Sequence, residues 1–246
     1  MRSSLRTALL IFGFAGISWS ATAFPILQSA AHAREVAARI MAEERFKNGV
    51  AARLLERMQR ERARTVLAPE ITRARGLVGL LAAQEATRQM SPAEADRSMH
   101  DAETDLELSL TISPVDAFLW LMLYSVSAAR NGIDEKCVSY LEQSYSTGPR
   151  EGWIALRRNR LALAALQMLS EPMQESATSE FVGMVDSYFI AEAAANLRST
   201  GWPHRERLLA KLGQIDVTSR EMFAKWLARD GVKVAVPGVK LDERPW

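Results

Sequence analysis

The sequence predicts an all-α protein, in which antiparallel helical hairpins form an array behind an N-terminal hydrophobic segment. Three observations favour this fold class. Apolar residues recur at helical spacing through most of the chain, short turn motifs interrupt that spacing, and a nine-residue phrase occurs twice. The alternation of apolar and polar residues that marks a half-buried strand is not sustained before "VKVAVPGVKL", close to the end.

The composition is that of a folded protein that does not bind nucleic acid. Of 246 residues, 48% are apolar and 24% charged, which argues against disorder. Lys and Arg number 31 against 29 for Asp and Glu, and the two extra bases, Arg2 and Arg6, precede residue 34 in a segment without acids. The remainder therefore carries no net charge, whereas binding to phosphates requires an excess of bases.

The charges after residue 33 are unevenly distributed. Residues 34–75 contain 11 bases and 6 acids, and residues 91–116 contain 7 acids and 1 base. Two interpretations stay open: helix faces of opposite charge that pair with each other, or a basic collar that lies against anionic lipid.

Residues 1–33 have the pattern of an export signal. Arg2 and Arg6 give a basic start, and an apolar run extends from Ala8 to Trp19. The basic start favours an N-terminus inside the cytoplasm and a body outside it. We therefore expect a periplasmic protein that interacts with the inner membrane through this segment.

Cleavage of this segment is left open by the sequence. Two A-x-A motifs, which end at Ala23 and Ala33, are candidate cleavage sites, and cleavage would release the protein into the periplasm. The alternative is an uncleaved anchor over about Ala8 to Leu27, since about 20 apolar residues can span a bilayer. Retention is favoured slightly, because a tether raises the effective concentration of an accessory protein near membrane machinery.

Residues 34–229 are expected to form one helical-repeat domain, and residues 230–246 an irregular tail. The phrase "SPAEAD" predicts a helix start at Pro92, with Ser91 as N-cap and Glu94 as its capping-box partner. The remaining helices follow from apolar spacing between turn residues. The expected helices are Arg34–Phe46, Val50–Leu67, Glu70–Met90, Pro92–Ile112, Pro114–Arg130, Ile133–Ser146, Glu151–Leu169, Ala177–Leu197, His204–Ile215 and Thr218–Ala228.

The repeated phrase reads "LELSLTISP" up to Pro114 and "LEQSYSTGP" up to Pro149, 35 residues later. A repeat of this length is typical of stacked helix pairs that share a core. With an aromatic early in the first helix (Trp120), small second-helix residues (Cys137 and Ser144) and a terminal proline, the unit resembles the tetratricopeptide pattern. That resemblance implies a solenoid, clearest over residues 70–169, with Trp120 largely buried. A generic helical array with a coincidental match is the alternative.

A second resemblance concerns function. "SPVDAFLWLMLYSVSAARNG" and "GPREGWIALRRNRLALA", behind a single N-terminal hydrophobic segment, resemble exported helical accessory proteins of bacterial exopolysaccharide or O-antigen assembly. The resemblance implies a protein partner in membrane-bound polysaccharide machinery, and it brings no catalytic residues with it.

The sequence contains no recognisable constellation for catalysis, metal or cofactor. The one cysteine, Cys137, lies at a position that the repeat buries, and the three histidines lack the spacing of a zinc site. No Walker loop, G-x-G-x-x-G or G-x-S-x-G occurs, so we expect no cofactor. In the run Asp101-Glu103-Asp105-Glu107, carboxylates two residues apart do not share a helix face, so we expect no glycosidase pair between neighbouring members of this run.

One helix face is a candidate binding site. Trp153, Arg157 and Arg160 follow the spacing i, i+4, i+7, which places an indole and two guanidinium groups on the same side of a helix. Such a face suits an acidic polysaccharide or a carboxylate-bearing partner. The alternative is a tryptophan between helices, with arginines that extend along it to solvent.

The sequence thus favours a non-catalytic interaction or scaffold protein outside the cytoplasm that supports synthesis or export of cell-envelope polysaccharide. The alternative is a helical periplasmic enzyme that acts on glycans, similar to a lytic transglycosylase. That enzyme would need an isolated catalytic glutamate in a cleft. A buried glutamate with a perturbed pKa that faces an open groove would favour the enzyme, and a concave face lined by Arg, Trp and Asn without such a glutamate would favour binding.

Overall fold

The computed structural model describes residues 2–42, 44, 46–61 and 69–240, and in them the protein is all-α, as predicted. The described residues form α-helices and short 3-10 helices, with no strand among them. The chain divides into two compact units, residues 1–114 (unit 1) and 115–246 (unit 2). The last part of the expected helix Val50–Leu67 and the last six residues of the tail lie outside the described residues.

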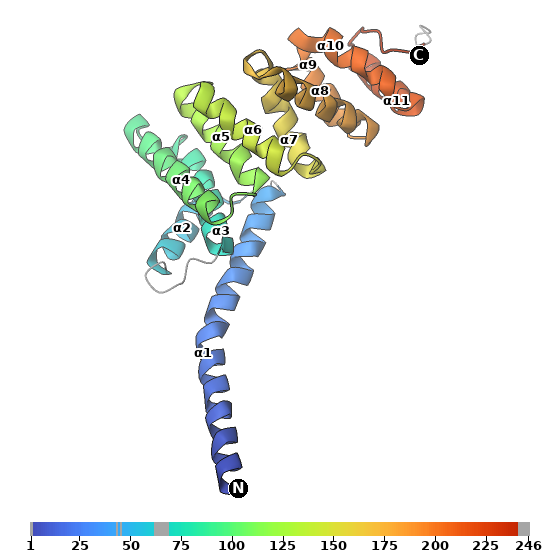
Figure 1. Ribbon diagram of the computed structural model, residues 1–246. Helices are drawn as coiled ribbons and strands as arrows, with labels where there is room; N and C mark the ends of the chain where they lie inside the picture. The colour runs from blue at the N-terminus through green and yellow to red at the C-terminus, as the bar shows by residue number, and fades with distance from the viewer. Residues whose placement is uncertain (1, 43, 45, 62–68, 241–246) are drawn as a thin grey trace. The chain divides into compact units, whose positions relative to one another are not determined.

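Unit 1 is built around one central helix. α3 packs against α4, α1 and α2, so that its residues are buried on nearly all sides (Figure 1). Gly76 allows α3 to pack close to α4, because a Cβ at this position would lie 3.1 Å from a methyl carbon of Leu106 and 3.4 Å from the carbonyl oxygen of Asp105, both on α4. The helices of unit 1 are α1 (Arg2–Met41), α2 (Val50–Glu61), α3 (Pro69–Ala86) and α4 (Pro92–Ile112).

An ion pair joins the two stretches of opposite charge within unit 1. Nη2 of Arg75 on α3 lies 2.9 Å from Oδ1 of Asp105 on α4, and the Arg75 side chain is almost fully buried. Arg75 belongs to the basic stretch and Asp105 to the acidic one, so these two residues pair, but in the interior of unit 1 rather than on solvated helix faces. The lipid collar stays a prediction.

The expected helix start at Arg34 is wrong, because α1 is continuous from Arg2 to Met41. Ala30, Ala33, Val36 and Ala37 are buried, and α1 packs against α3. The predicted boundary after residue 33 therefore lies inside a packed helix.

No helix within the described part of the chain is long and apolar enough to cross a bilayer. Much of the apolar run from Ala8 to Trp19 lies outside the residues whose side chains are described. Export and anchoring accordingly stay predictions.

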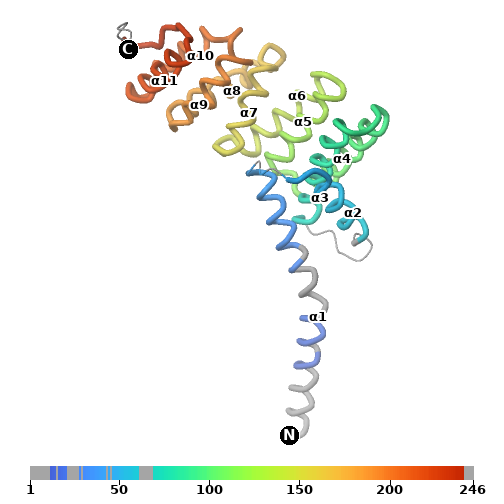
Figure 2. The backbone as a smooth tube through the Cα atoms, turned by 180° about the vertical axis from the view of Figure 1, so that it is seen from behind, coloured from blue at the N-terminus to red at the C-terminus, as the bar shows by residue number. Residues whose placement is uncertain are grey.

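Unit 2 is a succession of short helices joined by tight turns. α5 packs against α6, α7 against α8 and α8 against α9, while α10 and α11 cover α8 and α9 at the end of the unit (Figures 1 and 2). Residues 230–240 after α11 are irregular, as predicted. The elements are α5 (Ala117–Asn131), α6 (Glu135–Thr147), α7 (Gly152–Ala164), η1 (Leu166–Met168), α8 (Glu171–Asp186), α9 (Ile190–Arg198), η2 (Trp202–His204), α10 (Arg205–Lys211), η3 (Leu212–Gln214) and α11 (Val217–Arg229).

Capping residues decide where several helices begin. The predicted capping box of α4 is confirmed: the backbone N–H of Glu94 donates to Ser91 Oγ, and the backbone N–H of Ser91 donates to the Glu94 carboxylate. The expected start of the next helix at Pro114 is wrong by three residues. Asp116 accepts hydrogen bonds from the N–H groups of Phe118 and Leu119, so α5 begins at Ala117.

The two copies of the repeated phrase have the same pattern of burial. Leu106 and Leu141 are inaccessible to solvent, and Ser109 and Ser144 are buried with them. Each phrase forms the last turns of a helix, α4 or α6. The repeat thus marks helix ends that face a core.

Trp120 is half-buried, which corrects the expectation that it is largely buried. Its ring stacks on Tyr140 of α6 with centroids 5.9 Å apart. The aromatic contact between α5 and α6 is therefore present, but at the edge of the interface rather than inside it.

The expected single helix Ala177–Leu197 is two helices, α8 and α9. Tyr188 lies between them with a φ of 65°, in the left-handed region that bulky side chains rarely adopt. This turn ends α8 at Asp186 and redirects the chain into α9.

Candidate functional site

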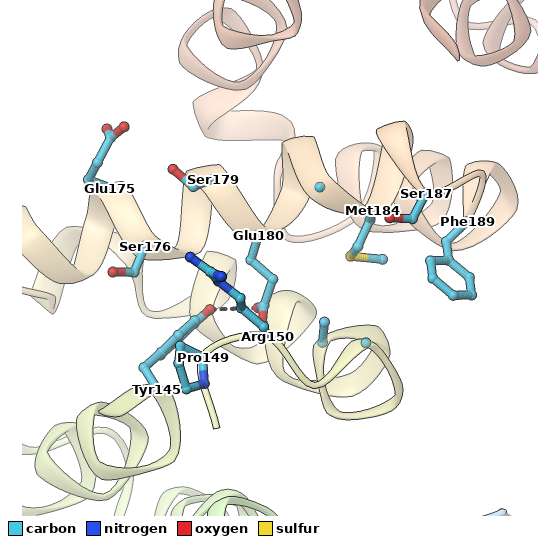
Figure 3. A pocket seen from close by; sticks show the side chains of 13 residues that line it. Tyr145, Pro149, Arg150, Glu175, Ser176, Ser179, Glu180, Met184, Ser187 and Phe189 are labelled. Carbon is cyan, nitrogen blue, oxygen red and sulfur yellow. Dashed lines mark hydrogen bonds between the residues drawn. The ribbon is translucent and has the colours of Figure 1, made fainter. Parts of the chain in front are cut away.

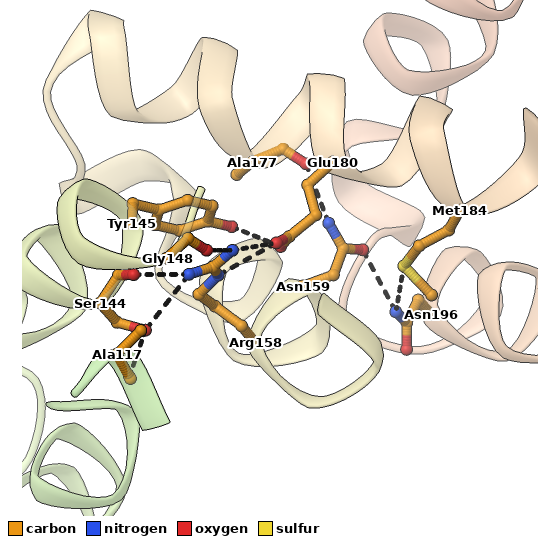
Figure 4. Close-up of polar contacts among 10 residues, drawn as sticks. All are labelled: Ala117, Ser144, Tyr145, Gly148, Arg158, Asn159, Ala177, Glu180, Met184 and Asn196. Carbon is orange, nitrogen blue, oxygen red and sulfur yellow. Dashed lines mark hydrogen bonds and ion pairs between the residues drawn. The ribbon is translucent and has the colours of Figure 1, made fainter. Parts of the chain in front are cut away.

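A buried ion pair holds the centre of unit 2. Arg158 of α7 is completely buried, and its Nη2 and Nε atoms donate to Oε1 of Glu180 on α8 over 2.6 and 3.0 Å (Figure 4). The Glu180 side chain is 7% exposed. A buried charge is tolerated only when a partner and hydrogen bonds compensate for its lost hydration, and both are present here.

The other N–H groups of Arg158 satisfy the end of α6. Nη1 donates to the carbonyl oxygen and the hydroxyl of Ser144, at 2.6 and 3.3 Å, and Nη2 donates to the Gly148 carbonyl at 3.0 Å. The last carbonyls of a helix lack partners within the helix, and they carry the negative end of its dipole. Arg158 therefore caps α6 while it pairs with α8.

The same helix end is fixed to α5. Ser144 Oγ donates to the Ala117 carbonyl over 2.8 Å. Gly148 lies so close that an added Cβ would be 2.5 Å from the Ala117 Cβ, so only glycine fits there. Arg158, Ser144 and Gly148 together position α5, α6, α7 and α8.

Tyr145 completes the surroundings of the carboxylate. Its hydroxyl donates to Oε2 of Glu180 over 2.7 Å, and the guanidinium carbon of Arg158 lies 4.0 Å from the centre of its ring. Burial, and then the charge of Glu180, raise the pKa of Tyr145 well above the ordinary value of tyrosine. The phenol therefore keeps its proton and acts as a donor.

A chain of amides extends this network towards α9. Asn159 Nδ2 donates to the Ala177 carbonyl of α8 over 2.9 Å, and Asn196 Nδ2 of α9 donates to Asn159 Oδ1 over 3.2 Å (Figure 4). Both side chains are buried. Five helices, α5 to α9, are thus connected by one network of polar side chains.

A pocket of about 550 Å³ opens beside the network. It lies between the α6–α7 turn and one face of α8, and Figure 3 shows Arg150 next to the hydrogen bond between Tyr145 and Glu180. The lining residues are Tyr145, Pro149, Arg150, Gly152, Ala155, Glu175, Ser176, Ser179, Glu180, Gly183, Met184, Ser187 and Phe189.

Glu180 has the surroundings of a permanent hydrogen-bond acceptor. Burial raises the pKa of its carboxyl, whereas the Arg158 guanidinium and the Tyr145 hydroxyl act in the opposite direction. Three N–H and O–H groups already donate to its two oxygens. A buried glutamate with a raised pKa at the wall of a pocket is the observation expected to favour the glycan-acting enzyme, whereas three hydrogen bonds to its oxygens tie this carboxyl to α6 and α7. Both functions therefore stay proposals.

The structure brings two of the three predicted site residues together. Trp153 is 42% exposed and its ring lies 5.0 Å from the ring of Phe118, while the guanidinium of Arg157 lies 5.2 Å from the same ring. Arg160 is exposed, and its backbone carbonyl accepts a hydrogen bond from the hydroxyl of Thr200. Trp153 and Arg157 thus contact the helix core and retain some accessible surface, and ligand binding there stays a prediction.

The environment of Cys137, also considered for chemistry, makes its thiol unreactive. Cys137 is buried, its Sγ lies 3.6 Å from the Tyr124 carbonyl oxygen, and burial raises the pKa of its thiol to about 11. A thiol in that state is a poor nucleophile. Among the described residues, no group of three His, Cys, Asp or Glu side chains is arranged to hold a metal.

Sequence reasoning missed the network and the pocket. One signal for Arg158 was present, because it lies four residues after Ile154 and four before Ala162, on a stripe that the structure buries. Nothing local identifies Glu180, whose partner is 22 residues away in the chain.

Comparison with known proteins gives no relative for this chain. No family model matches it, and no curated protein or solved structure matches it.

Proposed function

We propose that this chain is a non-catalytic helical interaction module that supports membrane-bound machinery for cell-envelope polysaccharide outside the cytoplasm. The observation that carries the proposal is the network of Arg158, Glu180 and Tyr145. These are the side chains best suited to chemistry beside the pocket, and their hydrogen bonds are used to hold helices together. Because these buried charges stabilise the fold, we expect the protein to act by binding partners on its surface and not by catalysis.

The tetratricopeptide-like arrangement is supported by the repeated phrase. Its two copies form equivalent helix ends, and the leucine and serine positions are buried in both. Stacked helix pairs of this kind present extended faces that bind other proteins.

The location is supported by the N-terminal segment. The side chains of Phe12, Phe14, Ile17 and Trp19 are each at least 71% exposed. Apolar side chains in such a number gain from contact with lipid or with another protein. This fits a segment that directs or tethers the chain to the inner membrane, with the body in the periplasm.

The partner face in this proposal contains Trp153, Arg157 and Arg160 on α7. An accessible indole edge near the Arg157 guanidinium, with Arg160 exposed on the same helix, suits a carboxylate-bearing partner, such as an acidic segment of a membrane protein. The contacts of Trp153 and Arg157 with Phe118 hold both side chains in place before a partner arrives.

Cross-linking in membranes, followed by capture of the tagged full chain, tests the proposal. We expect one or a few membrane proteins to be captured, and Arg157→Ala with Arg160→Ala to abolish their capture while circular dichroism stays unchanged. The control is Lys225→Ala with Arg229→Ala, which removes two exposed charges from α11. Capture that is equal in both double variants, or absent in all samples, would contradict the proposal.

The glycan-acting enzyme is the second candidate, because Glu180 is a buried carboxylate at the wall of a pocket. Clearing of a suspension of purified cell-wall glycan measures such an activity. We expect no clearing above buffer with the full chain. Clearing that Glu180→Gln abolishes, without loss of helix content, would favour the enzyme instead.

A further inference from the structure

Arg150 and Ser176 give one part of the pocket its polar groups. Arg150, in the turn between α6 and α7, is exposed, and Ser176 lines the same pocket from α8 (Figure 3). Ser176 donates its own proton to the Pro172 carbonyl, so its oxygen keeps lone pairs for a hydroxyl donor. This part of the pocket therefore offers one cation and one hydroxyl oxygen, whereas the Ser179 hydroxyl is used by Glu175.

Arg150 supplies the only uncompensated charge among the residues that line this pocket in the described structure. Glu175 is paired with Lys211, whose Nζ lies 2.6 Å from its carboxylate. Glu180 is paired with Arg158. Arg150 has no ion pair or hydrogen bond with another described residue, so the pocket has an unmatched positive charge that favours an anion.

The rest of the pocket lining is largely apolar. Gly152 and Ala155 come from α7, Gly183 and Met184 come from α8 beyond Ser176, and a Cβ added to Gly183 would meet no atom within 4 Å. The ring of Phe189 closes one end and lies 3.9 Å from the position of a Cβ on Gly152. Small residues and an aromatic ring leave room for a sugar ring, whose C–H face can pack against the aromatic ring.

The position of Phe189 depends on a strained residue. Tyr188 has a φ of 65°, and its own side chain is 58% exposed, so its conformation is not explained by burial of the tyrosine ring. The turn it makes brings the next residue, Phe189, to the pocket. The strained turn at Tyr188 therefore positions the Phe189 ring at the pocket.

We infer that this pocket binds an acidic oligosaccharide, with the carboxylate of one sugar unit on Arg150, a hydroxyl of that unit on Ser176, and the C–H face of a further unit against Phe189. The inference rests on the proposed function and gives it a ligand class: a short run of uronic-acid units of an anionic polysaccharide. The volume of about 550 Å³ lies within the range of small-molecule sites. A protein carboxyl terminus is the nearest rival, but such groups are usually held by backbone N–H groups rather than by serine hydroxyls.

Calorimetric titration of the full chain with a trimer of galacturonic acid tests the inference. We expect saturable binding that weakens as salt increases, because an ion pair at an exposed arginine is screened. Arg150→Gln should weaken binding tenfold or more, which is the usual effect of losing a hydrogen bond to a charged group. Gly183→Met, whose side chain grows into open space, should block binding without loss of helix content.

Two controls identify the site. Arg229→Gln removes an exposed arginine from α11, away from the pocket and from the α7 face, and it should leave the binding unchanged. A trimer of galactose and the peptide acetyl-Ala-Ala-Ala with a free carboxylate should bind at least tenfold more weakly than the uronate. No binding of the uronate, equal binding of either control ligand, or an equal loss in Arg229→Gln overturns the inference.

Failure of this inference and failure of the proposed function give different results. If the wild-type chain captures a membrane protein but does not bind the uronate, the ligand class is wrong and the interaction role stands. If it binds the uronate through Arg150 but captures no partner, the chain is a sugar-binding protein and the proposed interaction role is wrong.

Discussion

Replacement of Arg158 by methionine removes the central cation of unit 2 and leaves its partner buried. Methionine fills a similar length of space without a charge. Glu180 then keeps one hydrogen bond, from Tyr145, and loses both N–H groups that donate to Oε1. The Gly148 carbonyl also loses its donor from Arg158.

The size of the effect follows from this geometry. Removal of one partner from a buried ion pair costs about 3–5 kcal/mol, because the remaining charge is neither hydrated nor paired. Both side chains are nearly inaccessible, so solvent does not reduce the penalty. We expect Arg158→Met to lower the free energy of unfolding of unit 2 by about 3–5 kcal/mol.

Urea denaturation followed by tryptophan fluorescence measures this loss. All tryptophans except Trp19 belong to unit 2, so the signal reports mainly on that unit. Arg157→Met is the control, since the neighbouring arginine is half-buried and its contact with the Phe118 ring is worth only about 0.5–1 kcal/mol. Equal effects of the two substitutions, or a loss below about 1 kcal/mol in Arg158→Met, would refute the reasoning.

The dependence on pH and a double variant provide a second check. A carboxyl whose pKa is raised in the folded chain binds its proton more tightly there, so its stabilisation is present at low pH and is lost as the pH rises. Burial raises the pKa of Glu180, and removal of Arg158 takes away the main opposing influence. The decrease in the free energy of unfolding caused by Arg158→Met should therefore grow as the pH rises above about 4.3, the ordinary pKa of glutamate. Adding Glu180→Gln should restore part of the stability at pH 8, because no buried charge remains.

Three further results are expected. Gly76→Leu should unfold unit 1 at ambient temperature or lower its thermal midpoint by several degrees, since even a Cβ would lie 3.1 Å from Leu106; an unchanged midpoint would show that α3 and α4 can separate freely. Ser91→Ala should cost about 1 kcal/mol through loss of the capping box, and a denaturant midpoint equal to that of wild type would contradict this. N-terminal sequencing of the native protein should give residue 24 rather than 34 if the segment is cleaved, because cleavage after Ala33 would remove buried Ala30 and Ala33 from the core of unit 1; a start at residue 34 would contradict the packing of α1.

The helical class and several helix boundaries could be predicted because their causes are local. The ends of α4 follow from a capping box and from a serine-proline stop that adjoin the helix in sequence. The break at Tyr188 could not be predicted, because neither glycine nor proline marks it. There the path of the chain is set by packing of α8 and α9, which overrides the preference of tyrosine for negative φ.

The candidate site was harder to predict than the fold. Charged residues are usually solvated, so the residue type of Arg158 gives no sign of burial, although its spacing from Ile154 fits the buried face of α7. Its partners come from α6 and α8, and a pattern within one helix carries no information about them. Trp153 and Arg157 do share a face, as their spacing predicts, since that relation is internal to α7.

The hydrogen bonds of Arg158 have a consequence for recognition. The Arg158 side chain bonds to the end of α6 and to the middle of α8 at the same time, so it fixes the position of α7 along its own axis. A shift of α7 by one helical turn, about 5.4 Å, would break all of these hydrogen bonds. The walls of the neighbouring pocket belong to these same helices and their connecting turn. A ligand that enters it meets a cavity whose shape is already set, so little of its binding free energy is lost to ordering the protein.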